Sequence, residues 1–400
     1  MGEKYVLILG AGPEQLPIFH LCKKKKLKIV SVDRNKLAPG LKLADKYIVT
    51  SIKNDKKLIN KLKKLKCKII AVLTIANDVQ LINYKIAKAF NLKKPSLISS
   101  KLSSNKKLFY NYFKKYLNLP KSIFLKKIEN LSLIKKKFRF PIIIKPIDGR
   151  GARGTFLLNT IEDLKKYFSK SMENSEKKEV VLQEFISGPQ ISTESFIIKK
   201  KTYTLLSNRN YSDTKMMHPF IIENGGNHPA NLSKKIKKKI YNHVQKIRKG
   251  YNLNNGPLKC DLVLNKNKIY TLEASPRFGG GYVASHISEF LYGSNFLELY
   301  LDYLIGKNIK IKFKFKNLFV SIRFIFNNKE GILKSINNKK FKRFQKFVIL
   351  EKFFKKNGQK IKKIESHADR IGYVAVSHKN LKDSKNIANL ISKNYILTMK

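Results

Sequence analysis

Two segments decide the fold of this chain: KPIDGRGARG (145–154) and CDLVLNKNKIYTLEASPRFGGG (260–281). The first places a lysine and three glycines where backbone N–H groups can surround an anion. The second places two carboxylates, Asp261 and Glu273, on two runs that are typical of adjacent strands. A phosphate cradle and a carboxylate pair together are the minimum equipment for handling a metal–nucleotide complex.

The length and composition predict two or three domains in a reducing compartment. The chain has 400 residues, which is longer than one ordinary domain. Of these residues, 42% are hydrophobic, which is enough to build a core. No stretch approaches the roughly 20 apolar residues that span a bilayer. The N-terminus enters a strand pattern at once, and the three scattered cysteines form no CxxC pair. We therefore expect a cytoplasmic protein with no membrane partner.

The net charge of +57 raises the question of a nucleic-acid partner. The lysines run from end to end instead of gathering in one patch, and Asn, Ile, Phe and Tyr are also plentiful, as AT-rich codons would supply. We attribute the charge to genome composition and expect no specific nucleic-acid partner. Only ten of the 84 basic residues are arginine, and a planar guanidinium fits bidentate phosphate or carboxylate contact. Four of the ten lie in or beside the segments discussed here: Arg150, Arg153, Arg209 and Arg277.

The first predicted domain, residues 1–94, has the pattern of a doubly wound parallel sheet. Apolar runs alternate with lysine-rich segments at helical spacing, which is the pattern of βαβ units. The predicted strands are 5–9, 28–32, 47–50 and 69–75.

A glycine turn after the first of these strands leaves an alternative function open. Gly10-Ala11-Gly12, with Asp33 at the end of the second strand, resembles a dinucleotide fingerprint and would suit an NAD-dependent oxidoreductase. Gln15, however, occupies the place of the third glycine, which normally allows close packing of helix on sheet. A tight turn that binds no nucleotide is the competing interpretation.

The second predicted domain, residues 95–306, contains the chemistry, and a third, residues 307–400, is expected to be a small α+β closing module. An antiparallel hairpin with its turn at 265–268 is not what a simple nucleotide-binding α/β sheet would show. The fold class is therefore mixed, α/β and α+β. The predicted helices are 106–116 and 381–394, and the predicted strands of the second domain include 180–184, 192–199, 259–264 and 269–273.

Lys145 and the carboxylate pair have distinct expected roles. Lys145 ends an apolar strand and precedes a glycine loop, so it can add a point charge to a phosphate site. This is not a Walker A loop, because no GKS or GKT follows. Asp261 and Glu273 are expected on one face of the hairpin, where two hard oxygen ligands suit Mg²⁺ bound to substrate phosphates. The competing interpretations are a surface turn for the glycines and lysine salt bridges for the acids.

These motifs resemble the ATP-grasp superfamily, whose members include biotin carboxylase, carbamoyl phosphate synthetase and D-alanine–D-alanine ligase. The resemblance covers most of the chain and implies a pre-ATP-grasp α/β domain followed by a split ATP-binding module. Lys145 resembles the lysine that contacts the α- and β-phosphates, and Lys107, or its neighbour Lys106, resembles an earlier phosphate-contacting lysine. QEFISGPQ (183–190) is similar to the strand whose backbone binds the adenine edge. The ATP-binding residues implied are Lys107, Lys145, Gly149, Gly151, Arg153, Gly154, Gln183, Glu184, Phe185, Ile186 and Gln190.

Two positions depart from the family pattern. The ribose-binding glutamate of the family appears here as Gln190, and the usual Glu-x-Asn-x-Arg metal motif reads Glu273-Ala274-Ser275-Pro276-Arg277. The implied metal ligands are therefore Asp261, Glu273 and Ser275, for Mg²⁺ or, as a substitute, Mn²⁺. Serine has a shorter side chain than asparagine. This departure therefore affects the expected second metal position more than it affects the expected binding of ATP.

The resemblance implies an ATP-dependent ligase that joins a small-molecule carboxylate to an amine through an acyl phosphate. Arg277 is the candidate for contact with the transferring phosphoryl group or the acyl phosphate. Arg209 and the segment IIENGGNHP (221–229) are expected to line the acceptor side. His218 and His228 are expected to be exposed loop histidines. A homodimer is compatible with the sequence. The alternatives are a non-catalytic nucleotide-binding protein and the NAD-dependent oxidoreductase.

Overall fold

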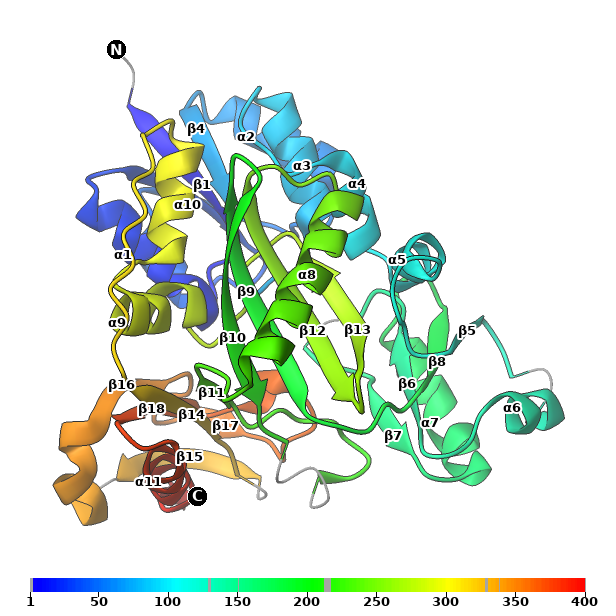
Figure 1. Ribbon diagram of the computed structural model, residues 1–400. Helices are drawn as coiled ribbons and strands as arrows, with labels where there is room; N and C mark the ends of the chain where they lie inside the picture. The colour runs from blue at the N-terminus through cyan, green and yellow to red at the C-terminus, as the bar shows by residue number, and fades with distance from the viewer. Residues whose placement is uncertain are drawn as a thin grey trace.

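The protein is described by a computed structural model for residues 3–128, 131–149, 151–211, 217–327, 330–337 and 339–399. Arg150, one of the arginines singled out above, lies outside these residues. The described chain forms a parallel four-stranded sheet, an antiparallel four-stranded sheet, an antiparallel eight-stranded sheet and a small three-stranded sheet (Figure 1).

The parallel sheet of the N-terminal domain is confirmed, with strand order β3-β2-β1-β4. Val6 and Ile8 of β1 point into one core, and Leu7 and Leu9 point into another, so both faces of the sheet are covered. This explains why the strand is apolar throughout. The elements are β1 Lys4–Leu9, η1 Pro13–Gln15, α1 Leu16–Lys24, β2 Lys28–Asp33, η2 Pro39–Leu43, β3 Lys46–Val49, α2 Asp55–Lys64, β4 Lys68–Leu73 and α3 Gln80–Ala89.

A helix from much later in the chain packs on this N-terminal sheet. Phe296, Leu297 and Leu301 of α10 (Phe296–Leu304) share a core with Val6 and Ile8, and Figure 1 shows α10 beside β1. The Asn295 side chain starts α10 by accepting a hydrogen bond from the Glu298 backbone N–H. The segment that follows SPRFGGG is thereby anchored to the first domain.

The antiparallel four-stranded sheet, of order β5-β8-β6-β7, carries Lys145 at the end of β6. Helix α7 starts with a capping box between Thr160 and Asp163, and it buries Leu164 and Phe168 against the sheet. Asn105 caps α5, which ends three residues earlier than predicted. The elements are α4 Leu97–Ser103, α5 Lys106–Phe113, β5 Ser122–Leu125, α6 Leu131–Lys137, β6 Ile142–Pro146, β7 Phe156–Leu158, α7 Ile161–Glu173 and β8 Val180–Glu184.

The eight-stranded sheet, of order β13-β12-β9-β10-β11-β14-β18-β16, forms the centre of the molecule. Helix α8 covers β12, because Val244 and Ile247 pack on Leu258 and Cys260. The predicted hairpin is present, with β12 ending at Asn265 and β13 beginning at Lys268. The elements are β9 Gln190–Ile198, β10 Lys201–Arg209, β11 Gly226–His228, α8 Lys234–Gly250, β12 Gly256–Asn265, β13 Lys268–Ser275, η4 Val283–Ile287 and α9 Ser288–Tyr292.

The C-terminal strands extend this same sheet. Strand β14 pairs with β11, and β18 pairs with β14 and β16, so the sheet continues across the predicted boundary at residue 306. The three-domain division stays a prediction. The remaining elements are β14 Phe319–Ile325, β15 Gly331–Asn337, η5 Lys339–Phe347, β16 Val348–Phe353, β17 Lys360–Ile361, η6 His367–Asp369, β18 Gly372–His378, α11 Leu381–Lys393 and β19 Ile396–Met399.

Candidate active site

A cleft of about 780 Å³ lies where the three larger sheets meet. Its lining includes Gly12 from the parallel sheet, Gly151 from the segment after β6, and Asp261 from the central sheet. The two segments that decide the fold therefore reach one cleft, although more than a hundred residues separate them in the sequence.

Asp261 and Glu273 pair directly across the β12–β13 hairpin. Residues paired in this way on antiparallel strands point to the same face, and both residues line the cleft. The structure thus brings the two carboxylates together, as the hairpin interpretation requires. Their role as metal ligands stays a prediction.

Asp261 is surrounded by hydrogen-bond donors. Its Oδ1 accepts from Arg209 Nη2 at 3.0 Å and from Ser192 Oγ at 3.1 Å, and its Oδ2 pairs with Lys259 Nζ. Burial acts to raise the pKa of Asp261, but the positive charges of Lys259 and Arg209 outweigh it and hold the pKa well below its usual value. Asp261 is therefore an anion at neutral pH and can accept a cation without losing a proton.

Arg209 connects Asp261 to a second carboxylate, that of Glu223. Its Nη1 pairs with Glu223 Oε2, while its Nη2 contacts Asp261. Arg370 also contacts Glu223, because its Nη2 donates to the Glu223 backbone carbonyl. The Arg370 guanidinium also lies 3.5 Å from the centre of the Phe324 ring. Arg209, expected on the acceptor side, is thus part of an ion-pair chain that ends at the carboxylate pair.

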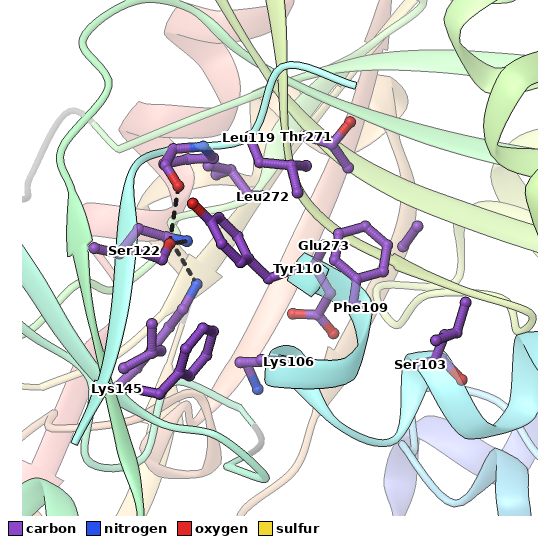
Figure 2. A pocket seen from close by; sticks show the side chains of 16 residues that line it. Ser103, Lys106, Phe109, Tyr110, Leu119, Ser122, Lys145, Thr271, Leu272 and Glu273 are labelled. Carbon is purple, nitrogen blue, oxygen red and sulfur yellow. Dashed lines mark hydrogen bonds between the residues drawn. The ribbon is translucent and has the colours of Figure 1, made fainter. Parts of the chain in front are cut away.

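Lys145 is held at the end of β6 by a chain of side-chain hydrogen bonds. Its Nζ donates to Gln183 Oε1 at 2.9 Å, and Gln183 Nε2 donates to Ser122 Oγ at 3.1 Å. Figure 2 shows Lys145, Ser122, Lys106 and Glu273 around one small cavity, and all four line it. Burial, followed by the positive charge of Lys106, lowers the pKa of Lys145 to about 8. Lys145 is therefore still mostly protonated at neutral pH, and it loses its charge only as the pH rises through about 8.

Of the two neighbouring lysines expected to contact phosphate, the structure places Lys106, and not Lys107, at the cleft. Lys106 lines the cleft, and its Nζ donates to the Gly149 carbonyl at 3.0 Å. Lys107 instead pairs with Glu179 at 2.5 Å. Neighbouring positions in the first turn of α5 point about 100° apart, so only one of the two lysines reaches the glycine segment.

The glycine segment after β6 faces the cleft, and most of its candidate residues line it. Gly149, Gly151 and Arg153 are among the lining residues, whereas Gly154 is not. Gly151 and Gly154 have positive φ angles, +60° and +66°, which favour glycine. A Cβ at Gly154 would also meet Asn174 at 2.8 Å. Gly154 therefore shapes the turn, and its role in ATP binding stays a prediction.

The predicted adenine segment passes along the cleft between β8 and β9. Glu184, Phe185, Ile186 and Gln190 all line it. Gln183 lines it too, but its side chain is committed to Lys145 and Ser122. The expected nucleotide contacts of Glu184, Phe185, Ile186 and Gln190 stay a prediction.

The SPRFGGG segment is fixed by two carboxylates that the sequence did not single out, Glu194 and Glu14. Glu194 accepts hydrogen bonds from the Gly279 N–H at 3.0 Å on both oxygens, and a Cβ at Gly279 would lie 2.2 Å from Glu194 Oε1. Glu14 of the N-terminal domain accepts from the Gly281 N–H at 2.9 Å. Burial raises the pKa of Glu194 to about 7 against the opposing charge of Lys259. The triple glycine lets the backbone approach both carboxylates.

Arg277 and Ser275 flank these glycines at buried positions. Arg277 Nε donates to Asp78 Oδ1 at 2.5 Å, so the guanidinium is held by the N-terminal domain while it lines the cleft. The Ser275 hydroxyl is buried and has no hydrogen-bond partner in the described part of the chain. Ser275 is not among the cleft-lining residues. Its role as a third metal ligand stays a prediction.

Hydrogen bonds made by side chains hold the glycine turn after β1 in place. Asp33 accepts from the Ala11 N–H at 2.8 Å, and Gln15 donates to the Ile75 carbonyl at 2.8 Å. A Cβ at Gly12 would lie 3.1 Å from Gln15 Oε1. Gln15 therefore fills space beside the turn that a third glycine would leave open.

The expectation for the two histidines was right for one and wrong for the other. His218 is exposed and contacts Asn159. His228 is buried in β11, inside the central sheet, where Ser207 Oγ lies 2.5 Å from its Nδ1. Burial lowers the pKa of His228 to about 3. A proline after each histidine indicated a loop, but pairing with β10 and β14 includes His228 in the sheet.

Two family comparisons agree with this geometry. Residues 103–281, which carry Lys145 and the hairpin, match the ATP-grasp domain family. Residues 103–281 form an ATP-grasp domain. Residues 6–91 match the PylC-like N-terminal domain family.

Curated relatives of this chain include enzymes that form C–N bonds. The formate-dependent phosphoribosylglycinamide formyltransferase of Saccharolobus solfataricus is 25% identical over 289 residues, which cover 69% of this chain and 70% of that protein. The tyramine–L-glutamate ligase of Methanocaldococcus jannaschii is 28% identical over 277 residues, which cover 67% and 73%. The predicted class, an ATP-dependent ligase that forms C–N bonds, is confirmed.

Solved structures share the fold of the whole chain. An L-amino acid ligase from Bacillus licheniformis is 18% identical and has a TM-score of 0.84, with all of both chains covered. The biotin carboxylase domain of the 2-oxoglutarate carboxylase of Hydrogenobacter thermophilus is 13% identical and has a TM-score of 0.77, with 100% of this chain and 91% of that chain covered. That second structure contains ADP and its magnesium salt. The predicted ATP-grasp fold is confirmed.

Among the described residues, no helix is both long and apolar enough to cross a bilayer.

Proposed function

We propose that this protein activates a small-molecule carboxylate with Mg–ATP and joins it to an amine in the cleft between the glycine segment and the β12–β13 hairpin. The observation that carries the proposal is that Lys145 and Lys106 share one cleft with the opposed pair Asp261 and Glu273. Cationic and anionic groups placed in this way suit a nucleotide whose phosphates bridge lysines and a metal ion.

In the first step, an oxygen of the substrate carboxylate attacks the γ-phosphorus of ATP. The bond from that phosphorus to the bridging β–γ oxygen breaks, ADP leaves, and an acyl phosphate forms. Lys145, fixed by Gln183, offsets negative charge on the phosphates. Arg277 lines the cleft close to the hairpin and is our candidate for contact with the transferring group.

In the second step, the amine nitrogen attacks the carbonyl carbon of the acyl phosphate. The carbon–oxygen bond to phosphate breaks, inorganic phosphate leaves, and the nitrogen loses a proton as the amide forms. Arg209, on the Glu223 side of Asp261, is our candidate for stabilising the departing phosphate. The glycine segment would shield the acyl phosphate from water.

The donor set fits a magnesium ion held jointly with a nucleotide. No group of three or more His, Cys, Asp or Glu side chains forms a complete metal site in the described ranges. Two carboxylates with phosphate oxygens and waters suit Mg²⁺, or Mn²⁺ in its place. Asp261 and Glu273 would hold the ion, which would supply charge neutralisation on the β- and γ-phosphates.

The test is a screen of carboxylate and amine pairs for ADP and phosphate release, run with ¹⁸O-labelled carboxylates. An acyl phosphate pathway transfers one ¹⁸O atom from the carboxylate to the released phosphate. We expect labelled phosphate for every productive pair. Unlabelled phosphate beside a labelled amide would contradict the proposed first step.

A further inference from the structure

His367 is a cleft residue that neither sequence segment includes, and it contacts two walls of the cleft at once. Its backbone N–H donates to the Gly151 carbonyl at 3.2 Å. Its imidazole Nε2 accepts from the Glu223 N–H at 3.5 Å. One residue of the C-terminal segment therefore joins the glycine segment to the Glu223 side of the cleft.

The turn that carries His367 is fixed at both ends. At its start, the Ser366 N–H donates to Asp369 Oδ2 at 2.8 Å, and the two residues form a capping box. At its end, Arg370 donates to the Glu223 carbonyl. Because the turn is held on both sides, the backbone position of His367 is set by the C-terminal segment and by its contact with Glu223.

Glu223 continues the contact toward the carboxylate pair. Its carboxylate pairs with Arg209, and Arg209 contacts Asp261 at 3.0 Å. A chain of contacts thus runs from Gly151 through His367, Glu223 and Arg209 to Asp261. The glycine segment and the candidate metal ligand are the two ends of that chain.

The imidazole is in the right protonation state to act as an acceptor. Burial, and then the positive charges of Arg370, Arg209 and Lys259, hold the pKa of His367 well below its usual value. The negative charge of Asp261 opposes this effect but does not reverse it. A neutral imidazole that accepts at Nε2 carries its proton on Nδ1.

We propose that His367 is a positioning residue that holds the glycine segment closed over the nucleotide with its backbone N–H and orients Glu223 and Arg209 with its imidazole. The inference rests on the proposed function for the identity of the nucleotide and the reaction. It predicts that the two contacts of one residue have separable effects, one on closure of the glycine segment and one on the coupling of ATP use to amide formation.

Three variants separate the contacts. His367→Ala removes the imidazole and keeps the N–H, whereas His367→Pro removes both. Proline is tolerated at the first position of a helical turn, and Ser366 before it is already extended, with φ −151° and ψ 168°. His367→Gln keeps a side-chain acceptor, and His218→Ala is the control, because His218 is exposed and does not line the cleft.

The first readout is amide hydrogen exchange in residues 151–155 with Mg²⁺ and a non-hydrolysable ATP analogue. We expect the analogue to slow exchange in the wild type, in His367→Ala and in the control. In His367→Pro, we expect exchange about 3- to 10-fold faster than in His367→Ala, the loss typical of one neutral hydrogen bond. Equal protection in the Ala and Pro variants would overturn the backbone role.

The second readout is the ratio of ADP released to amide formed. We expect His367→Ala to lower kcat by about 3- to 10-fold and to raise the ratio, with His367→Gln restoring both. An unchanged ratio in His367→Ala would overturn the imidazole role. This test does not use His367→Pro, so it stands even if that variant fails to fold. A wild type that forms no amide with any pair would contradict the proposed function, while the exchange readout would still decide the closure.

Discussion

Lys145 shows how the cleft changes the chemistry of a single side chain. Burial beside Lys106 lowers its pKa to about 8, whereas a surface lysine titrates near 10.4. The sequence placed Lys145 correctly at the end of an apolar strand. It gave no means of predicting the bond to Gln183 or the choice between Lys106 and Lys107, because both depend on where α5 lies relative to β6 and β8.

The lowered pKa of Lys145 predicts a pH-dependent affinity for ATP. The charged form binds phosphate, and it is lost as the pH rises through about 8. We expect the Kd for Mg–ATP to increase about tenfold between pH 7 and pH 9, measured by titration calorimetry. Lys145→Arg keeps its charge over this range and is expected to bind with a flat pH profile. A profile equally steep in Lys145→Arg would show that another group causes the dependence.

At the scale of elements, the β12–β13 hairpin was predictable and its supports were not. Alternating apolar residues, a short polar turn and two acids predicted the strands and their relation, and the pairing of Asp261 with Glu273 agrees. Glu194 and Glu14 carry no local signal, because they contact Gly279 and Gly281 from β9 and from the N-terminal domain. His228 was misjudged for the same reason, since only sheet pairing decides that it is buried.

The contact between Glu194 and Gly279 predicts a large effect for a single methyl group. In Gly279→Ala the new Cβ would lie 2.2 Å from Glu194 Oε1, and overpacking of this kind costs about 1–3 kcal/mol. We expect a lower midpoint in urea denaturation. Gly12→Ala is the matched control, because its Cβ would meet only the flexible end of Gln15 at 3.1 Å. Equal midpoints for the two variants would contradict the packing described here.

At the scale of the whole molecule, the N-terminal domain is a structural partner of the ATP-grasp domain. Asp78 holds Arg277, Glu14 holds Gly281, and the Ala76 N–H donates to the Phe278 carbonyl at 3.0 Å. Helix α10 then packs on the parallel sheet. Composition and periodicity predicted each sheet separately, but the contacts between sheets depend on tertiary packing that no local pattern encodes.

The interdomain pair of Asp78 and Arg277 predicts a shared loss of stability when either side chain is removed. Both side chains are mostly buried, with 19% and 9% of their surfaces exposed. Asp78→Ala leaves a buried guanidinium without this carboxylate, which we expect to cost about 3 kcal/mol in unfolding free energy. In a double-mutant cycle with Arg277→Ala, the two losses should not add. Additive losses would show that the pair contributes no stability as a unit.

The central claim is that Asp261 and Glu273 hold a metal–nucleotide complex opposite Lys145. The most direct test is calorimetric titration of a non-hydrolysable ATP analogue with and without Mg²⁺, into the wild type and into an Asp261→Asn/Glu273→Gln double variant. We predict that Mg²⁺ tightens binding by at least about tenfold in the wild type and has little effect in the double variant. An equal effect of Mg²⁺ in both proteins would contradict the account.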